Sequence, residues 1–405
     1  MTKLLPITLL NPHADDFTKT PVSFWLVRRR GLGKYAYLID EPAETGAFID
    51  VLIDGTVSSL FGQGWFAKIP RWIRLLLLRV EVAFWLHINN LTDKVTVHWS
   101  PETIADRSIL YVFSYKNCVG AFKKRQAIIE RFQIKLVNLS HYFIRTKEKA
   151  DNIASLTNVT LTSESDLRLN SYFNHFFIAP YPFIVLPFAI NSRFALKIPI
   201  SERMGICAAT GSFHNLQNEM PVKYYLDFIG FFKTDTYHPV RKLLFEHRVE
   251  LNSWLDCRIS KYREMDEKKA AFKKMLMIPY LDVLQTKYFS FDMVDFFNNH
   301  QYAIVGEEAS GSPTIGFFEG MACGCVMLGQ QGSFYEGLDL IPGVHYLEHN
   351  GTIESIRKVI EETSANPARK AQISQSGLNY VMINCRPQSV WRALQWRLIQ
   401  KLAVS

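Results

Sequence analysis

Residues 302–329 read Tyr-Ala-Ile-Val-Gly-Glu-Glu-Ala-Ser-Gly-Ser-Pro-Thr-Ile-Gly-Phe-Phe-Glu-Gly-Met-Ala-Cys-Gly-Cys-Val-Met-Leu-Gly. Their apolar runs predict a strand at 302–305 and a second strand at 325–328. Between the strands lie a loop of small residues at 310–314 and a helix that ends at Gly324. The stretch therefore predicts one β-loop-α-β unit.

The loop of this unit is small enough for a ligand to touch the backbone. The N-terminus of the following helix directs unpaired N–H groups toward such a ligand. Pro313 suits the first turn of the helix, and Ser310 or Ser312 is expected to cap it. With Gly311 and Thr314, these serines are candidate contacts for an anionic ligand. The alternative is an ordinary buried β-α-β unit.

The helix and the second strand carry a recognisable pattern, whose residues are Glu319, Met321, Ala322, Gly324 and Val326. This pattern resembles the donor-binding segment of group 1 glycosyltransferases, which have the GT-B fold. The resemblance implies that Glu319 binds the ribose of a sugar nucleotide. The sequence departs from the family pattern at one position, because Gly311 stands where a second glutamate is usual. Glu307 and Glu308 are nearby but out of register with that position.

A second resemblance covers residues 183–194, an apolar strand followed by Pro187 and, further on, Arg193-Phe194. The same enzymes have an apolar strand, Pro-Asn-Gly-Val-Asp and Arg-Phe before their interdomain linker, which would lie here near 195–203. The implied fold is α/β of the GT-B type, with two Rossmann-like domains facing a cleft. The expected parts are an acceptor-side domain at 1–195, a nucleotide-sugar-binding domain at 203–380, and a helix at 381–405 that packs back on the first domain.

Short apolar and alternating runs predict several strands in the first domain. They lie at 4–10, 23–27, 35–38, 47–53, 94–98, 109–114, 134–139 and 159–162. In an open α/β sheet, ligands bind at the carboxyl ends of such strands. Polar residues that directly follow a strand are therefore candidates for chemistry.

Three such residues are candidate catalytic groups. His141 follows the strand at 134–139 and is a candidate for acceptor contact or proton transfer, or else a structural histidine. Glu164 and Asp166 follow the strand at 159–162, where the resemblance places carboxylates that face the cleft. The alternative for both acids is capping of a turn or a helix.

The second domain is expected to begin with a strand at 205–209, followed by the tight loop Thr210-Gly211-Ser212. By resemblance, the backbone N–H groups of this loop approach the donor phosphates. The family usually places an arginine and a lysine shortly afterwards to hold a diphosphate. No basic residue lies between Ser212 and Lys223, so a diphosphate would lack these partners.

A His238-Pro239 pair instead opens a basic helix that contains Arg241. The helix N-terminus, His238 and Arg241 would together hold a single phosphate. Bacterial sialyltransferases and some transferases of 3-deoxy-octulosonic acid (Kdo) use a similar pair on CMP-sugars, which makes CMP a candidate nucleotide. An ordinary helix with proline in its first turn is the alternative.

Composition narrows the class of protein. The chain has 405 residues, 48% hydrophobic and 21% charged, which is typical of a globular protein with two cores. A net charge of +8 favours an anionic partner. No nucleic-acid signature accompanies that charge, so nucleic acid is not expected as a partner. Six cysteines without a paired framework and no evident signal peptide indicate a reduced, cytoplasmic setting.

One apolar stretch, 72–88, is interrupted by Arg74, Arg79 and Glu81. It therefore lacks the run of about 18 uncharged apolar residues that a bilayer-spanning helix needs. It predicts a helix, with Arg71 at its start. One interpretation is peripheral docking of 71–88 onto the inner face of an anionic membrane. The other is a core helix whose arginines reach outward.

These observations predict a glycosyltransferase that moves a sugar from a nucleotide donor to a cell-surface polysaccharide or glycolipid. The absence of an Asp-x-Asp motif predicts a metal-independent reaction without a cofactor. Kdo from CMP-Kdo is one donor hypothesis, and a UDP- or GDP-hexose is another. A catalytically silent module that binds glycan or membrane, and a sugar-nucleotide epimerase, are alternatives of other classes. The sequence leaves the sugar, the linkage and the stereochemistry open.

Overall fold

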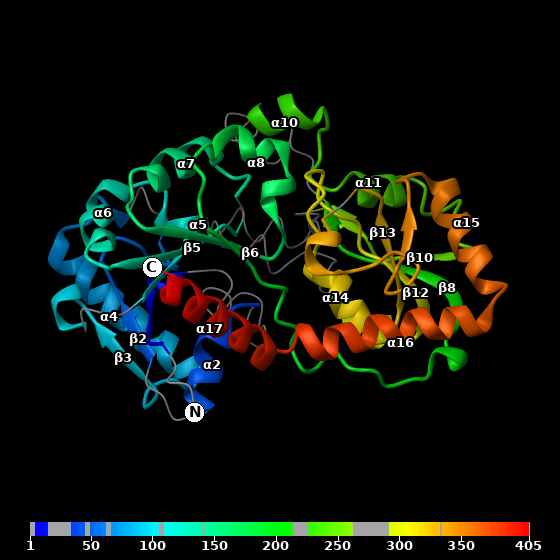
Figure 1. Ribbon diagram of the computed structural model, residues 1–405, viewed down its shortest axis with the longest axis horizontal. Coiled ribbons are helices and arrows are strands. Elements are labelled where there is room, and N and C mark those ends of the chain that lie inside the picture. The colour runs from blue at the N-terminus through cyan, green and yellow to red at the C-terminus, as the bar shows by residue number, and fades with distance from the viewer. Residues whose placement is uncertain are drawn as a thin grey trace, which may run out of the picture. The chain divides into compact units, whose positions relative to one another are not determined.

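The computed structural model describes residues 5–14, 34–44, 49–61, 66–104, 109–140, 142–213, 226–261, 291–332 and 334–404. The chain divides into two compact units (Figure 1). Unit 1 contains Met1–Glu164, Phe173–Ala189 and Pro387–Ser405. Unit 2 contains Ser165–Tyr172 and Ile190–Arg386. Residues 165–172, predicted in the first domain, thus cluster with the second unit.

Unit 1 is built on a seven-stranded sheet in the order β3-β2-β1-β4-β5-β6-β7, in which every strand pairs with its neighbours in parallel. The strands are β1 Ile7–Leu10, β2 Ile49–Leu52, β3 Val95–His98, β4 Ile109–Phe113, β5 Ile134–Asn138, β6 Val159–Ser163 and β7 Phe183–Val185. The α-helices are α2 Tyr37–Glu44, α4 Arg71–Ile88, α5 Ser114–Asn117, α6 Phe122–Glu130, α7 Thr146–Ala154, α8 Ser171–Phe176 and α17 Pro387–Val404, of which α8 begins in unit 2. Short 3₁₀ turns occupy Pro12–Ala14 and Pro101–Thr103.

The central strands of this sheet are apolar without alternation because helices cover both faces. All five residues of β4, Ile109–Phe113, are buried. The strand order 3-2-1-4-5-6 of the first six strands is that of a dinucleotide-binding Rossmann fold.

The C-terminal helix α17 completes the core of unit 1 and lies beside α2 (Figure 1). Its residues Val390, Trp391, Leu394 and Leu398 are buried in the same cluster as the sheet residues. The Gln395 side chain also accepts a hydrogen bond from the Leu5 N–H at 2.9 Å and donates one to the Leu5 carbonyl at 3.2 Å. The segment that packs on unit 1 begins at Pro387, whereas residues 381–386 of the helix expected at 381–405 belong to unit 2.

Unit 2 has a five-stranded parallel sheet in the order β10-β8-β12-β13-β14 and a separate pair, β11-β9. The strands are β8 Met204–Ala209, β9 Ser212–Phe213, β10 Leu255–Cys257, β11 Ser260–Lys261, β12 His300–Ile304, β13 Val326–Gln330 and β14 Leu347–His349. The α-helices are α10 Leu226–Phe232, α11 Pro239–Glu246, α13 Met293–Asn298, α14 Ile315–Ala322, α15 Ile353–Ser364 and α16 Pro367–Asn384. Short 3₁₀ turns lie at Leu167–Leu169, Ile200–Glu202 and Glu336–Leu338.

Most predicted elements in the described part of the chain lie within a few residues of the observed ones, and one has the wrong type. The strand predicted at 23–27 lies outside the described residues. Residues 35–38, predicted as a strand, form a turn and the start of helix α2, which continues to Glu44. All six cysteines are unpaired thiols, as their spacing predicted.

A buried ion pair fixes the loop after β2. The Asp54 carboxylate lies 3.3 Å from Arg125 Nε, and both side chains are at most 1% exposed. The Arg125 guanidinium also donates to the carbonyls of Asn117 and Val119, each at 3.0 Å. Removal of one partner would leave an uncompensated charge inside the protein. This lowers the free energy of unfolding more than removal of both partners does.

Arg125→Met is therefore expected to lower the free energy of unfolding by about 3–5 kcal/mol in urea denaturation. Asp54→Asn/Arg125→Met should recover part of that loss, because no buried charge remains. Arg131→Met, which breaks an exposed pair with Glu102, is the matched control and should change little. Equal effects of the single and double variants would contradict this account.

Candidate functional site

The sheet of unit 2 has one topological switch point, between β8 and β12. Its strands occur in the chain order 2-1-3-4-5, so the connections from β8 and from β12 run to opposite sides of the sheet. Ligands of such sheets bind at the carboxyl ends of the two strands at that point. The loops there are 210–211, between β8 and β9, and 305–314, which contain six of the predicted donor-site residues.

Arg241, on helix α11, ties these two loops together. Its guanidinium donates to the Ser212 carbonyl at 2.8 Å, to the Gly306 carbonyl at 3.0 Å, and through Nε to the Val305 carbonyl. The side chain is buried. Sequence analysis predicted that Arg241 helps to hold a phosphate, and these three hydrogen bonds of its guanidinium go to backbone carbonyl groups.

The close approach of Arg241 requires glycine in both loops. Gly211 has φ +127°, and a Cβ there would lie 2.8 Å from Arg241 Nε. Gly306 has φ +58°, and a Cβ would lie 3.0 Å from Arg241 Cγ. Both positions combine a backbone conformation that other residues rarely adopt with a lack of space.

The loop before α14 is braced by its own hydrogen bonds. The Glu308 N–H donates to the Ser312 carbonyl at 3.1 Å, and the Gly311 N–H donates to the Glu308 carbonyl at 2.8 Å. The Ser310 hydroxyl donates to the Glu308 carboxylate at 3.2 Å, and the Asn170 amide donates to the Ser310 carbonyl at 3.0 Å. The small-residue loop is therefore fixed in shape.

Helix α14 begins at Ile315, two residues later than a cap at Ser312 with Pro313 in the first turn predicts. Thr314, not Ser310 or Ser312, is at the N-cap position, and Pro313 precedes it. The predicted end at Gly324 is confirmed. There the Gly324 N–H donates to the Met321 carbonyl at 2.9 Å, and the Cys325 N–H to the Gly320 carbonyl at 3.0 Å, as in a Schellman motif.

Two further predicted donor residues lie on helices of this unit. Glu319 is in the second turn of α14 and is partly exposed. His238 is the N-cap residue of α11, with Pro239 at the first helical position, so the predicted His-Pro start of that helix is confirmed. Thr210, in contrast, is buried, and its hydroxyl contacts the sulfur of Met293 at 3.5 Å.

Glu307 is a polar residue of this edge that sequence analysis left aside. It is buried, and its Oε1 accepts hydrogen bonds from the Gln330 N–H at 3.0 Å and from the Tyr335 hydroxyl. Its Oε2 has no hydrogen-bond partner among the described residues. Burial raises the pKa of Glu307, and the hydrogen bonds from Tyr335 and Gln330 oppose that rise. The sequence signal that could have identified Glu307 is an acidic residue two positions after an apolar strand.

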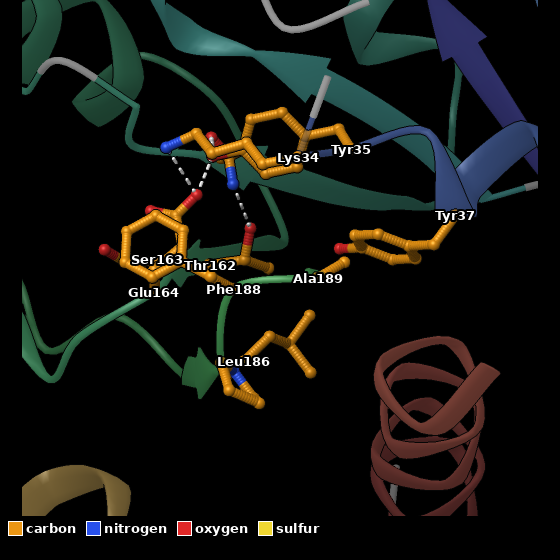
Figure 2. A pocket seen from close by; sticks show the side chains of 11 residues that line it. Lys34, Tyr35, Tyr37, Thr162, Ser163, Glu164, Leu186, Phe188 and Ala189 are labelled. Atoms are coloured by element: carbon orange, nitrogen blue, oxygen red, sulfur yellow. Dashed lines mark hydrogen bonds and ion pairs between the residues drawn. The ribbon is translucent and has the colours of Figure 1, made fainter. Parts of the chain in front are cut away.

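Unit 1 has a pocket of its own, at the carboxyl ends of β5, β6 and β7 (Figure 2). The space inside it is about 220 Å³, open solvent included. Its lining consists of Lys34, Tyr35, Tyr37, Asn138, Thr162, Ser163, Glu164, Leu186, Pro187, Phe188 and Ala189.

Glu164 is the only carboxylate among the described residues of that lining, and it is held by two neighbours. Lys34 Nζ lies 3.0 Å from Glu164 Oε1 and 4.8 Å from the centre of the Phe188 ring. The Tyr35 hydroxyl contacts both Glu164 and Asn138, the latter at 3.0 Å (Figure 2). Burial and the charge of Glu164 raise the pKa of Tyr35 well above its ordinary value, so Tyr35 stays protonated and donates.

The other two predicted catalytic residues are His141 and Asp166. His141 lies outside the described residues. Asp166 belongs to unit 2, where it caps the turn Leu167–Leu169 and binds the Arg168 guanidinium at 2.7 and 2.6 Å. These bonds lower the pKa of Asp166. Asp166 therefore makes the capping contacts that were the alternative for it, and the division between unit 1 and unit 2 falls between Glu164 and Asp166.

The chain matches no known family model and no curated protein. Among solved structures, sucrose-phosphate synthase from Thermosynechococcus elongatus is similar with a TM-score of 0.54 and 13% identity, over 99% of this chain and 100% of that one. Anabaena Alr3699/HepE, in complex with UDP and glucose, has a TM-score of 0.53 and 10% identity, over 98% and 100%. At these identities the likeness establishes the fold and not the activity. The predicted GT-B fold with two Rossmann-like α/β domains is confirmed.

The raised pKa of Glu307 gives a prediction for stability against pH. The folded protein holds this proton to a higher pH than the unfolded chain, whose ordinary value is 4.5. The stability that Glu307 contributes is thus fully present below that value and is lost as pH rises through the folded-state pKa. Urea titrations should show Glu307→Gln gaining stability relative to the unmodified protein as pH rises toward neutral. The exposed control Glu362→Gln should show no such trend, and parallel curves for Glu307→Gln would contradict the assignment.

Proposed function

We propose that the protein is a glycosyltransferase that moves a sugar from a nucleotide donor, bound by unit 2, to a hydroxyl of a glycan or glycolipid. One observation carries this proposal. The switch point of the unit 2 sheet consists of two glycine loops held by Arg241, next to the N-terminus of α14. Such an edge presents backbone N–H groups to an anion.

The reaction needs a stabilised leaving phosphate, and these groups suit that role without a metal ion. The N-terminus of α14 and the backbone of loops 210–211 and 305–314 would face the phosphate. Glu319, on the same helix, would hold the ribose as the resemblance implies. The metal-free reaction remains part of the proposal.

The identity of the nucleotide rests on the phosphate partners. Arg241 donates three hydrogen bonds to carbonyl groups, and the sequence has no lysine or arginine between Ser212 and Lys223. We infer that so few basic partners hold a single phosphate, at the N-terminus of α11 beside His238. A donor with a single phosphate is a CMP-linked sugar such as CMP-Kdo. A UDP- or GDP-hexose is the alternative, and HepE, of similar fold, is described in complex with UDP-glucose.

For the acceptor, we assign the base to Glu164 in unit 1. Its Oε1 lies 3.0 Å from Lys34 Nζ, so the carboxylate is held in place within the pocket lining. A carboxylate in a pocket can take the proton of an acceptor hydroxyl in an inverting transfer.

A catalytically silent glycan- or membrane-binding module is the second candidate. It is favoured by Gly311, which replaces the usual glutamate. Gly311 has φ +83°, so the backbone of this loop disfavours a glutamate at that position.

The first test is a thermal-shift panel of CMP, UDP, GDP and ADP on the full chain. A nucleotide at about 100 times its dissociation constant adds about 2.7 kcal/mol of stability, which raises the melting temperature. We expect a shift with CMP, and a shift with UDP or GDP instead would select the alternative donor. Glu319→Gln should abolish the shift and the control Glu362→Gln should keep it. No shift with any nucleotide would reject the transferase in favour of the silent module.

The second test concerns the base. Glu164→Gln should lower kcat by about 10²–10⁴-fold and leave the nucleotide-induced shift unchanged, because the residue lies in unit 1. Asp166→Asn is the matched control, since Asp166 caps a turn, and should retain kcat. An active Glu164→Gln variant would move the role to another group, with His141 as the next residue to replace.

A further inference from the structure

The outward face of helix α4 is apolar. Trp72, Leu76 and Val80 are 70%, 57% and 64% exposed, and their spacing of four residues puts them in one row along the helix. The opposite face, with Val82 and Trp85, is buried in the core of unit 1. A helix that packs on a core by one face ordinarily has polar residues on the other. Burial within unit 1 therefore does not explain the outer row.

Basic side chains surround this row. Lys68, Arg71 and Arg79 are exposed, and the Arg79 guanidinium lies 5.6 Å from the ring centre of Trp99, itself 36% exposed. The one acidic residue of α4, Glu81, is buried. The α4 surface, defined as Lys68, Arg71, Trp72, Leu76, Arg79, Val80 and Trp99, is thus both apolar and positive.

This combination restricts the partner. A second copy of the chain, related by a two-fold axis, would bring the same positive charges together. An anionic lipid surface supplies both an apolar layer for Trp72 and Leu76 and negative headgroups for the basic residues. Tryptophan and arginine side chains are also favoured at the boundary between headgroups and acyl chains.

None of the helices in the described part of the chain has the length and apolarity needed to cross a bilayer. We propose that the α4 surface docks unit 1 on an anionic bilayer, with α4 lying in the plane of the interface. This goes beyond the proposed transfer reaction and does not depend on it, since a silent module would dock in the same way.

The test is co-sedimentation of the full chain with two kinds of vesicle, phosphatidylcholine alone and phosphatidylcholine mixed with phosphatidylglycerol. We expect binding to the mixed vesicles only, released at 1 M salt, where the screening length falls from about 8 to about 3 Å. Equal binding to both vesicles, or none to either, would overturn the proposal.

Variants of the surface locate the contact. Arg71→Ser/Arg79→Ser should weaken binding to the mixed vesicles by about 30-fold, and Trp72→Ser/Leu76→Ser by at least about tenfold. Trp396→Ser is the control, because Trp396 is 60% exposed on α17 of the same unit, and should bind as before. Melting temperatures check that each variant is folded.

Two results would overturn the assignment to α4. One is binding that both double variants retain in full. The other is a dimer in gel filtration that Trp72→Ser/Leu76→Ser dissociates while vesicle binding persists, which would make the surface a contact between copies.

Discussion

The candidate ligand-binding edge of unit 2 depends on one buried guanidinium. Arg241 donates to carbonyl groups on both sides of the switch point, and its planar fork sets the separation of the two loops. Glycine at 211 and 306 is needed because this fork lies against the backbone. The shape of the edge is thus determined by a residue on α11, outside the loops themselves.

Unit 1 has the same kind of sheet and uses its switch point differently. Between β1 and β4, Asn11 and Asn117 are buried and joined by a hydrogen bond of 2.8 Å. The Asp54–Arg125 pair lies next to them, and Asn11 accepts a hydrogen bond from the Asp54 N–H at 3.1 Å. Polar side chains of the protein occupy the position where such sheets ordinarily bind a ligand. The pocket lies farther along the sheet, at β5 to β7, where Glu164 is found.

Helices and strands were predictable where the sequence pattern that indicates them lies within the element itself. The buried parallel strands were predictable because each is a short apolar run bounded by turn residues. Residues 35–38 were mistaken for a strand because the alternation Tyr-Ala-Tyr-Leu fits a period of two. The helical period becomes visible only when Ile39 to Glu44 are included.

The candidate site was less predictable, because its contacts are not local. The acceptors of Arg241 lie 29, 64 and 65 positions away, and nothing near Arg241 in the sequence distinguishes a carbonyl partner from a phosphate. Glu164 and Asp166 are two positions apart and still belong to different units. The carboxyl ends of strands were predictable as the place for polar groups, but the partner of each group was not.

The interleaving of the two units has a consequence for synthesis on the ribosome. The core of unit 1 includes Val390, Trp391, Leu394 and Leu398 of α17, which are translated after all of residues 190–386. Domains tend to fold as their residues emerge, so the earlier part of unit 1 must wait with an uncovered apolar face while unit 2 is made. A chaperone would bind this incomplete sheet during synthesis. The apolar face of the sheet is covered only when α17 has been translated and packs on it.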